Sequence, residues 1–114
     1  DDIPKIQLVL STNSGLSFSK SIVVGSLNTN GRVDTTILES GDIIVSWMDT
    51  AGEAKIMLSR FDITGGLLGT TKVAVSSASR RSGFPIIEAL GNSVYVTWTD
   101  IDATPQVKVA RIDY

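Results

Sequence analysis

The sequence contains an internal repeat with a period of 51 residues, and this feature limits the possible folds more than any other. Without a gap, Val94–Asp100 (VYVTWTD) aligns with Ile43–Asp49 (IIVSWMD). The same shift aligns further pairs: Gln106–Val107 with Lys55–Ile56, Ala110–Asp113 with Ser59–Asp62, Gly66 with Gly15, and Val75 with Val24. A partial third copy therefore begins the chain. A repeat of about 50 residues that is rich in short β-type runs is typical of propeller-like folds rather than of helical solenoids.

Short apolar runs separated by turn residues predict nine β-strands and no helix. The expected strands are Ile6–Leu10, Leu16–Val24, Arg32–Leu38, Ile43–Trp47, Lys55–Phe61, Leu67–Val75, Phe84–Leu90, Val94–Trp98 and Gln106–Ile112. Glycine, asparagine, aspartate and serine, which favour tight turns, separate these runs. The run Ile43–Trp47 is apolar at four of its five positions, which is typical of a strand covered on both faces.

These strands fall into groups of two, four and three, which predict three tandem units. We expect a partial unit at residues 1–30, a complete four-stranded unit at 31–76, and three strands of a following unit at 77–114. Four strands per repeat is the content of one propeller blade. An immunoglobulin-like sandwich is the alternative, but its strands are not copies of one another.

We therefore expect an all-β fold of four-stranded antiparallel propeller blades in tandem, forming an incomplete ring. A propeller needs about four blades to close its ring, and this chain supplies fewer. We expect it to be a fragment of a longer chain. The alternative is an assembly of several copies that associate through their open strand edges.

The composition excludes several classes of site and partner. The chain has 12 acidic and 10 basic residues among 114, so it has no basic surplus that would attract nucleic acid. It has no cysteine and no histidine, which excludes disulfides, Cys/His metal sites and imidazole-based triads. No run is long enough to span a bilayer. We predict no cofactor, no metal, no nucleic-acid partner and no membrane insertion.

The turn at residues 11–18 (STNSGLSF) resembles the Asp-box of sialidase-like propellers, Ser-x-Asp-x-Gly-x-Thr-Trp. The residues at the five motif positions are Ser11, Asn13, Gly15, Ser17 and Phe18. Ser11 and Gly15 match the motif, and the other three are conservative replacements. In that family the box lies between the third and fourth strands of a blade, which is where the strand pattern places it here.

The resemblance implies a structural role for this turn. We expect the Asn13 side chain to bond N–H groups of the turn, Gly15 to adopt a positive φ, and Phe18 to pack under the turn. In the second copy, Asp62–Leu68, only Gly66 matches the motif.

The resemblance also indicates where sialidase chemistry would be found. Sialidases bind the substrate carboxylate with three arginines and use a tyrosine nucleophile, which is an exception among glycosidases. The first arginine of that family lies in an Arg-Ile-Pro motif that opens the first strand of a blade. The equivalent place here holds Gly83–Phe84–Pro85, and one repeat earlier Arg32 is the best single match. We take Arg32 as the candidate ligand-binding residue, because a planar guanidinium can bond a carboxylate bidentately; a solvated surface charge is the alternative.

Other residue pairs recur at the repeat spacing, and structural roles are expected for them. They are Arg60 and Arg111, expected to pair with Asp62 and Asp113 or their neighbours; Trp47 and Trp98, expected to pack between units; and Asp49 and Asp100, expected to form turns, with an acid/base or metal-binding role as the alternative. No catalytic residue is predicted.

The sequence as a whole predicts a non-catalytic binding or structural module, and the resemblance implies carbohydrate as its ligand class. By resemblance alone, the protein would be secreted or located at the cell surface. The alternative is a part of an exo-sialidase or another glycoside hydrolase whose catalytic residues lie mostly outside these residues. The fold does not decide between the two, because propellers carry out many functions.

Overall fold

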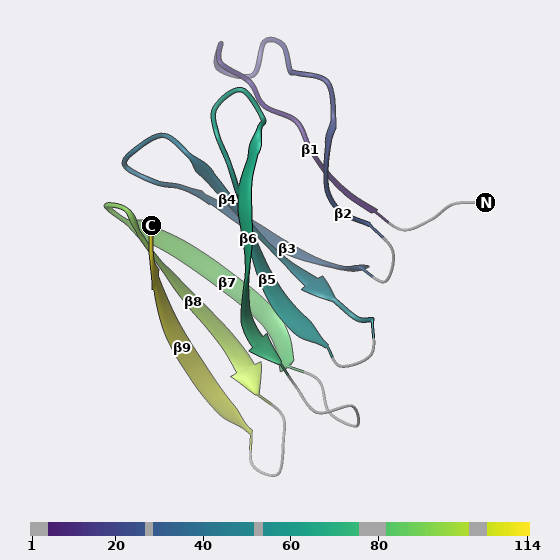
Figure 1. Cartoon of the computed structure of the whole chain (residues 1–114), viewed down its shortest axis with the longest axis vertical. Helices are drawn as coiled ribbons and strands as arrows, with labels where there is room; N and C mark the ends of the chain where they lie inside the picture. The colour runs from purple at the N-terminus through teal and green to yellow at the C-terminus, as the bar shows by residue number, and fades with distance from the viewer. Residues whose placement is uncertain (1–4, 27–28, 52–53, 76–81, 101–104) are drawn as a thin grey trace, which may run out of the picture.

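The structure, a computed structural model, describes residues 5–26, 29–51, 54–75, 82–100 and 105–114. These residues form nine strands in three antiparallel sheets and contain no helix (Figure 1). Sheet A contains β1 (Lys5–Leu8) and β2 (Ile22–Ser26); sheet B contains β3 (Thr29–Ile37), β4 (Ile43–Asp49), β5 (Lys55–Phe61) and β6 (Leu67–Val75); sheet C contains β7 (Ser82–Leu90), β8 (Ser93–Asp100) and β9 (Gln106–Asp113). The predicted all-β class and the grouping of two, four and three strands are confirmed.

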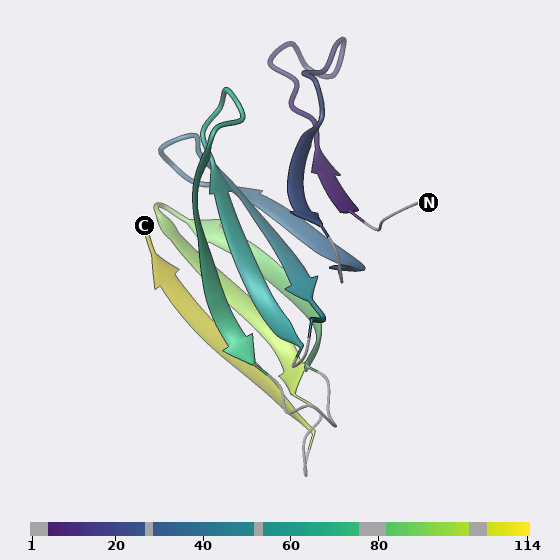
Figure 2. The same cartoon turned by 45° about the vertical axis from the view of Figure 1, so that its right-hand side comes forward.

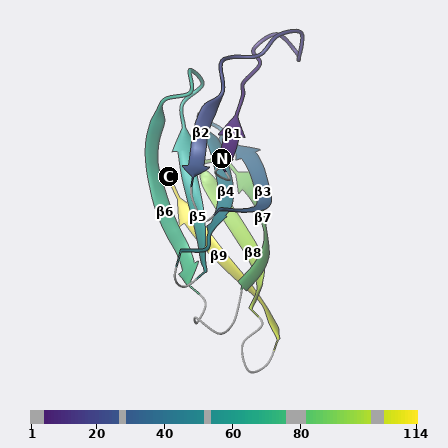
Figure 3. The same ribbon diagram turned by 90° about the vertical axis from the view of Figure 1, so that its right-hand side faces the viewer.

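The bounds of β5 and β6 are as predicted, whereas β2 begins later than expected. The sequence placed the start of this strand at Leu16, but β2 begins at Ile22. The preceding residues belong to a long turn, in which the Ser19 hydroxyl accepts the Leu10 N–H at 3.0 Å. Serine side chains compete with strand partners for backbone groups in this way. In Figure 3 this turn projects beyond the sheets.

The unit boundaries differ slightly from those drawn on the sequence. β3 begins at Thr29, before the predicted boundary between residues 30 and 31. The second predicted boundary, between residues 76 and 77, lies outside the described residues. Each sheet is a simple up-and-down meander, so every strand pairs with its neighbour in sequence.

The sheets stack face to face, with sheet B in the middle. They follow one another across the view of Figure 2, from sheet A (purple and blue) through sheet B (blue to teal) to sheet C (green to yellow). The strand β4 is buried along almost its whole length, as predicted for a strand covered on both faces. Ile43 and Val45 pack against sheet A, and Ile44 packs against sheet C. This division follows from the alternation of side chains along a strand.

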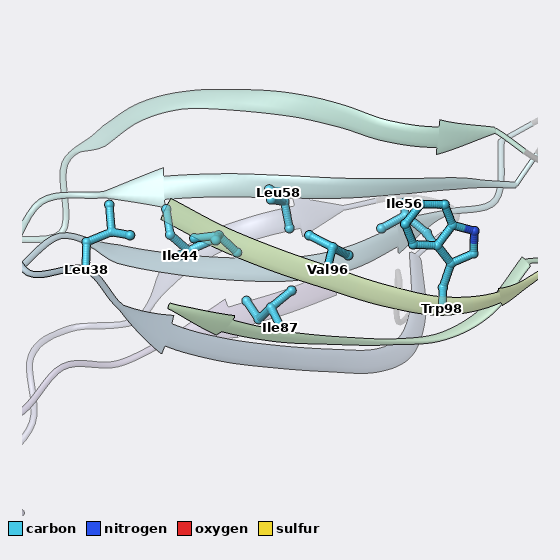
Figure 4. Packing of buried hydrophobic residues seen from close by; sticks show 8 residues of the cluster. Leu38, Ile44, Ile56, Leu58, Ile87, Val96 and Trp98 are labelled. Atoms are coloured by element: carbon cyan, nitrogen blue, oxygen red, sulfur yellow. The ribbon is translucent and has the colours of Figure 1, made fainter. Parts of the chain in front are cut away.

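The larger core lies between sheets B and C (Figure 4). Its buried members are Leu38, Ile44, Ile56, Leu58, Ile87, Val94, Val96 and Trp98. Three of these occupy alternate positions of β8, so one face of that strand supplies them. Trp98 lies close to Ile56 in Figure 4. The predicted packing of both tryptophans between units is confirmed for Trp98 by this cluster.

The core between sheets A and B includes the second tryptophan. The Trp47 ring lies directly against the backbone of Gly25 in β2, where a Cβ atom would lie 2.9 Å from Cε3 of the ring. Its Nε1–H donates to the buried Ser59 hydroxyl at 2.9 Å. A buried indole N–H needs such a partner, and the bond fixes the position of the ring. Gly25 is therefore required where β2 approaches β4.

Between sheets B and C, the 51-residue repeat holds in the second and third strands but not in the first. Ile43 pairs with Phe61, and their equivalents 51 residues later, Val94 and Ile112, pair with each other as well. Five residues separate the paired Ile37 and Ile43, whereas four separate Ala89 and Val94. The β7–β8 turn is shorter by one residue, so β7 is displaced relative to β3.

This displacement corrects the alignment of Arg32. The gapless shift placed Arg32 on Gly83. The strand pairing instead aligns Asp34 with Ile86, because their partners Ser46 and Thr97 are equivalent in the repeat. Arg32 therefore corresponds to Phe84 or, within the irregular register that precedes Ile86, to Pro85.

We predict that Gly25→Ala destabilises the protein by about 1–3 kcal/mol, because the added methyl group overpacks the Trp47 ring. Gly69→Ala is the matched control, since a Cβ at Gly69 meets no atom within 4 Å, and we expect a change below about 0.5 kcal/mol. Urea unfolding followed by tryptophan fluorescence measures both variants. Equal stability of the two variants would contradict the close packing of Trp47 on β2.

Candidate functional site between the first strands of sheets B and C

A shallow hollow of about 410 Å³ lies where β3 of sheet B runs beside β7 of sheet C. Five residues line it: Arg32, Val33 and Asp34 from β3, and Pro85 and Ile86 from β7. Arg32, the candidate ligand-binding residue of the sequence, is exposed and lies on its wall. The strand register shifts beside the hollow on both sides, between Asn30 and Asp34 and between Gly83 and Ile86. Such irregularities reorient side chains and are common beside binding sites.

Asp34 joins the two sheets at this hollow. Its Oδ2 accepts the Ile87 N–H from sheet C at 2.9 Å, and its Oδ1 accepts the N–H of Thr35 at 2.9 Å. Further along, the Thr36 hydroxyl accepts the Ala89 N–H at 3.2 Å. These bonds satisfy N–H groups on the free edge of β7, which would otherwise be open to another strand. Asp34 therefore has a structural role, and Arg32 is the residue of the wall that could bind an anion.

The turns of sheets B and C are also joined. The Glu39 N–H donates to the Gly91 carbonyl at 2.9 Å, and the Ser40 N–H donates to Asn92 Oδ1 at 3.0 Å. On the side of sheet C, the Tyr114 N–H donates to the Asn92 carbonyl at 2.9 Å, which ties the end of the chain to the same turn. Together with the bonds of Asp34 and Thr36, these contacts hold the walls of the hollow in one relative position.

The Asp-box-like turn forms a closed network of side chains. The Ser11 hydroxyl accepts the Gly15 N–H at 2.8 Å and donates to Asn13 Oδ1 at 2.9 Å. Asn13 Oδ1 also accepts the Ser17 N–H at 3.0 Å, and its Nδ2 donates to the Ser17 hydroxyl at 2.8 Å. Gly15 has a φ of 85°. Four of the five motif residues are thus connected through one turn.

The fifth motif residue is placed differently from the sequence expectation. The Phe18 side chain is 61% exposed, so its ring does not pack beneath the turn. The Leu16 side chain of the same turn is exposed as well.

In the equivalent turn of sheet B, a side-chain acceptor also bonds N–H groups of the turn, but this acceptor is an aspartate, Asp62. Asp62 Oδ1 accepts the Thr64 hydroxyl at 2.6 Å, the Thr64 N–H at 2.9 Å and the Gly66 N–H at 2.9 Å. These bonds lower the pKa of Asp62, and the Thr64 hydroxyl makes the largest contribution. Asp62 lies one repeat after Ser11, so both turns carry an acceptor at their first position. In the sequence, only Gly66 matches the Asp-box motif at this turn, so the Asp62 acceptor was missed. The residues Asp62, Thr64 and Gly66 nevertheless form the pattern Asp-x-Thr-x-Gly.

The predicted ion pair of Arg60 is wrong in its partner. Arg60 bonds Asp42 Oδ2, with Nε at 2.8 Å, rather than Asp62. Asp62 is already held by its own turn. The guanidinium also lies over the Tyr114 ring, 5.2 Å from its centroid, in the range of a cation–π contact. Burial raises the pKa of Tyr114, and the charge of Arg60 opposes this effect.

The remaining repeated residues have structural positions. Arg111 pairs with Asp113 at 2.7 Å, as predicted. Asp49 Oδ1 accepts the Ala51 N–H at 2.9 Å within a turn, and Asp100 pairs with Lys108 at 2.8 Å. In the described part of the chain no group of three or more acidic residues could hold a metal ion.

One pair of residues was not placed by the sequence. The structure pairs Tyr95 across strands with Glu88. Both line a second hollow of about 280 Å³ with Ala89 and Leu90, on the face of sheet C that points away from sheet B. This hollow is separate from the one beside Arg32.

No protein-family profile, curated protein or solved structure matches this chain. Among the described residues, no helix has the length and apolar character needed to cross a membrane. Arguments about function therefore rest on the geometry of the hollow and on the repeated turns.

We predict that Thr64→Ala raises the pKa of Asp62 toward its ordinary value, because the strongest bond to the carboxylate is lost. A carboxylate with a lowered pKa stabilises the fold above its unfolded pKa of about 3.9, and this contribution disappears as the pH falls through the folded value. The variant should therefore lose less stability on acidification than the parent. NMR titration of carboxyl carbons measures the shift.

Asp113 serves as the internal control for this titration. Its pKa is lowered by Ser93 and Arg111, neither of which contacts the turn of Asp62, so it should titrate alike in both proteins. An unchanged Asp62 midpoint in Thr64→Ala would show that the hydroxyl does not hold this carboxylate.

Proposed function

We propose that the chain is part of a sialidase-like, Asp-box β-propeller and acts as a non-catalytic module that binds carbohydrate. The observation that supports this architecture most is the stacking of repeated meanders in which the first strands, β3 and β7, run beside each other. Propeller blades are four-stranded antiparallel sheets arranged radially, and sheet B has the strand order of one complete blade. The side-chain acceptors at the Ser11 and Asp62 turns also favour this architecture.

Arg32 and its hollow support a carboxylate-bearing sugar as the ligand. The volume of about 410 Å³ lies within the range of small-molecule sites. The guanidinium can bond a carboxylate bidentately, and Val33, Pro85 and Ile86 offer an apolar wall against the face of a sugar ring. Asp34 is engaged by N–H groups of both sheets. A secreted or cell-surface location is part of the same proposal.

The residues of this hollow favour binding over catalysis. Sialidase chemistry requires three arginines around the carboxylate and a tyrosine nucleophile in the same cleft. The five lining residues include one arginine and no tyrosine. Tyr95 and Glu88 line the other hollow, on the far face of sheet C. We therefore assign these residues to recognition, and to the support of the fold, rather than to bond cleavage.

The test is titration of the protein with N-acetylneuraminic acid, followed by NMR, with galactose as the neutral control sugar. We expect weak saturable binding of the acidic sugar, and shifts that include residues around Val33 and Ile86. Arg32→Ala should weaken binding at least tenfold, which corresponds to about 1.4 kcal/mol. Arg32→Lys should weaken it less, because the charge is retained but the bidentate geometry is lost.

Arg111→Ala is the matched control, because it removes the same charge from the opposite face of sheet C and should leave affinity unchanged. Absence of saturable binding by the parent protein, or equal affinity in Arg32→Ala, would overturn the proposal. Hydrolysis of a fluorogenic sialoside that is lost in Arg32→Ala would show instead that the module is catalytic.

A further inference from the structure

The outer face of sheet C, which points away from sheet B, carries large exposed apolar side chains. Leu90, Val107 and Val109 are 73%, 75% and 62% exposed. They lie on the same face as Tyr95, because the strand register places Tyr95 beside Glu88 and Arg111, and Val109 beside Thr97. Exposed apolar surface of this kind on a sheet marks an interaction site. The question is what covers it.

The repeat answers this question, because each of these residues has a buried equivalent in sheet B. Leu90 corresponds to Leu38, and Val107 and Val109 correspond to Ile56 and Leu58. The three equivalents are 3%, 0% and 1% exposed. Their cover is sheet C itself. The open face of sheet C is therefore equivalent, in the repeat, to the face of sheet B that sheet C covers.

The polar residues of the two faces correspond as well. Tyr95 takes the place of the buried Ile44, and Arg111 takes that of Arg60. The Arg60 guanidinium lies over the ring of Tyr114, which directly follows the last strand of the covering sheet. Arg111 on the outer face is thus in the position where the next sheet would place an aromatic ring. By strand pairing, Glu88 occupies the position that Thr36 has in sheet B. The Thr36 hydroxyl accepts an N–H from β7, the first strand of the neighbouring sheet.

A second copy of this chain does not offer the matching surface. The covering face of sheet C comes from alternate positions of its second strand, namely Val94, Val96 and Trp98, and these are buried against sheet B. The corresponding face of sheet B packs on sheet A. Sheet A, at the other end of the stack, has two described strands, which correspond to the third and fourth strands of a unit.

We propose that the outer face of sheet C is the docking surface for one further copy of the 51-residue repeat, stacked on sheet C as sheet C is stacked on sheet B. The proposal extends the propeller architecture of the proposed function and does not depend on carbohydrate binding. The contacts on the new copy are those that sheet C makes now: alternating valines and a tryptophan from its second strand, and an aromatic ring over Arg111.

The test appends a duplicate of residues 64–114 directly after Tyr114, which continues the repeat in register. The chain has no cysteine, so a single V109C substitution in the original copy gives a unique thiol probe on the outer face. We expect maleimide labelling of V109C to be at least tenfold slower in the extended chain than in the 114-residue chain. L16C, at a side chain that is 87% exposed, is the control and should label equally fast in both.

Val107→Lys in the original copy tests whether the protection arises at this face. The lysine is solvated in the 114-residue chain but would be buried in the extended chain, where an unpaired charge is costly, so labelling of V109C should recover. An appended repeat that stays unfolded by circular dichroism, or that folds while V109C remains reactive, would overturn the proposal. So would a 114-residue chain that forms a stable oligomer by light scattering and protects V109C as its concentration rises, because the occupant would then be a second copy. None of these measurements involves a sugar, so their failure is distinguishable from failure of the proposed function.

Discussion

The structure depends on the burial of sheet B on both of its faces. Ile43 and Val45 face sheet A, while Ile44 between them faces sheet C. Full burial of one such side chain contributes about 1.5–3 kcal/mol, so exposing a few of them would remove an amount comparable to the whole net stability of a small domain, about 5–15 kcal/mol. A sheet with two apolar faces cannot stand alone in water, since each face must be removed from solvent. The repeat provides this cover by placing a similar sheet on each side.

Stacked sheets of this kind must also be prevented from merging into one continuous sheet at their adjacent first strands. The side chains of Asp34 and Thr36 occupy the N–H groups of Ile87 and Ala89 on the edge of β7. Side-chain acceptors thus replace a strand partner and keep β3 and β7 next to each other without pairing. The two strands belong to different sheets, and the hollow beside Arg32 lies between them.

The sequence predicted the strands and their grouping well because alternating apolar residues and turn residues are local signals. The bounds of β5 and β6 follow from them directly. The late start of β2 was not predictable in the same way, since it depends on the Ser19 hydroxyl bonding Leu10 across a long turn. The choice of Asp42 rather than Asp62 as the partner of Arg60 depends on a contact across the β4–β5 hairpin. Likewise, the displacement of β7 comes from a single residue in a turn, which a gapless comparison of sequences cannot detect.

The position of a residue within the repeat also helps to choose between candidate functional residues that the sequence pattern alone does not distinguish. Tyr95 and Glu88 pair across strands, and in isolation such a pair invites comparison with a tyrosine nucleophile and its glutamate. Their equivalents in sheet B are Ile44, which is fully buried, and Thr36, which bonds a neighbouring strand. In sheet B these positions face the neighbouring sheet, whereas Arg32 lies where two first strands leave an open hollow. Our two proposals are therefore compatible, because the docking surface uses the face of a sheet and the ligand site uses the space between two first strands.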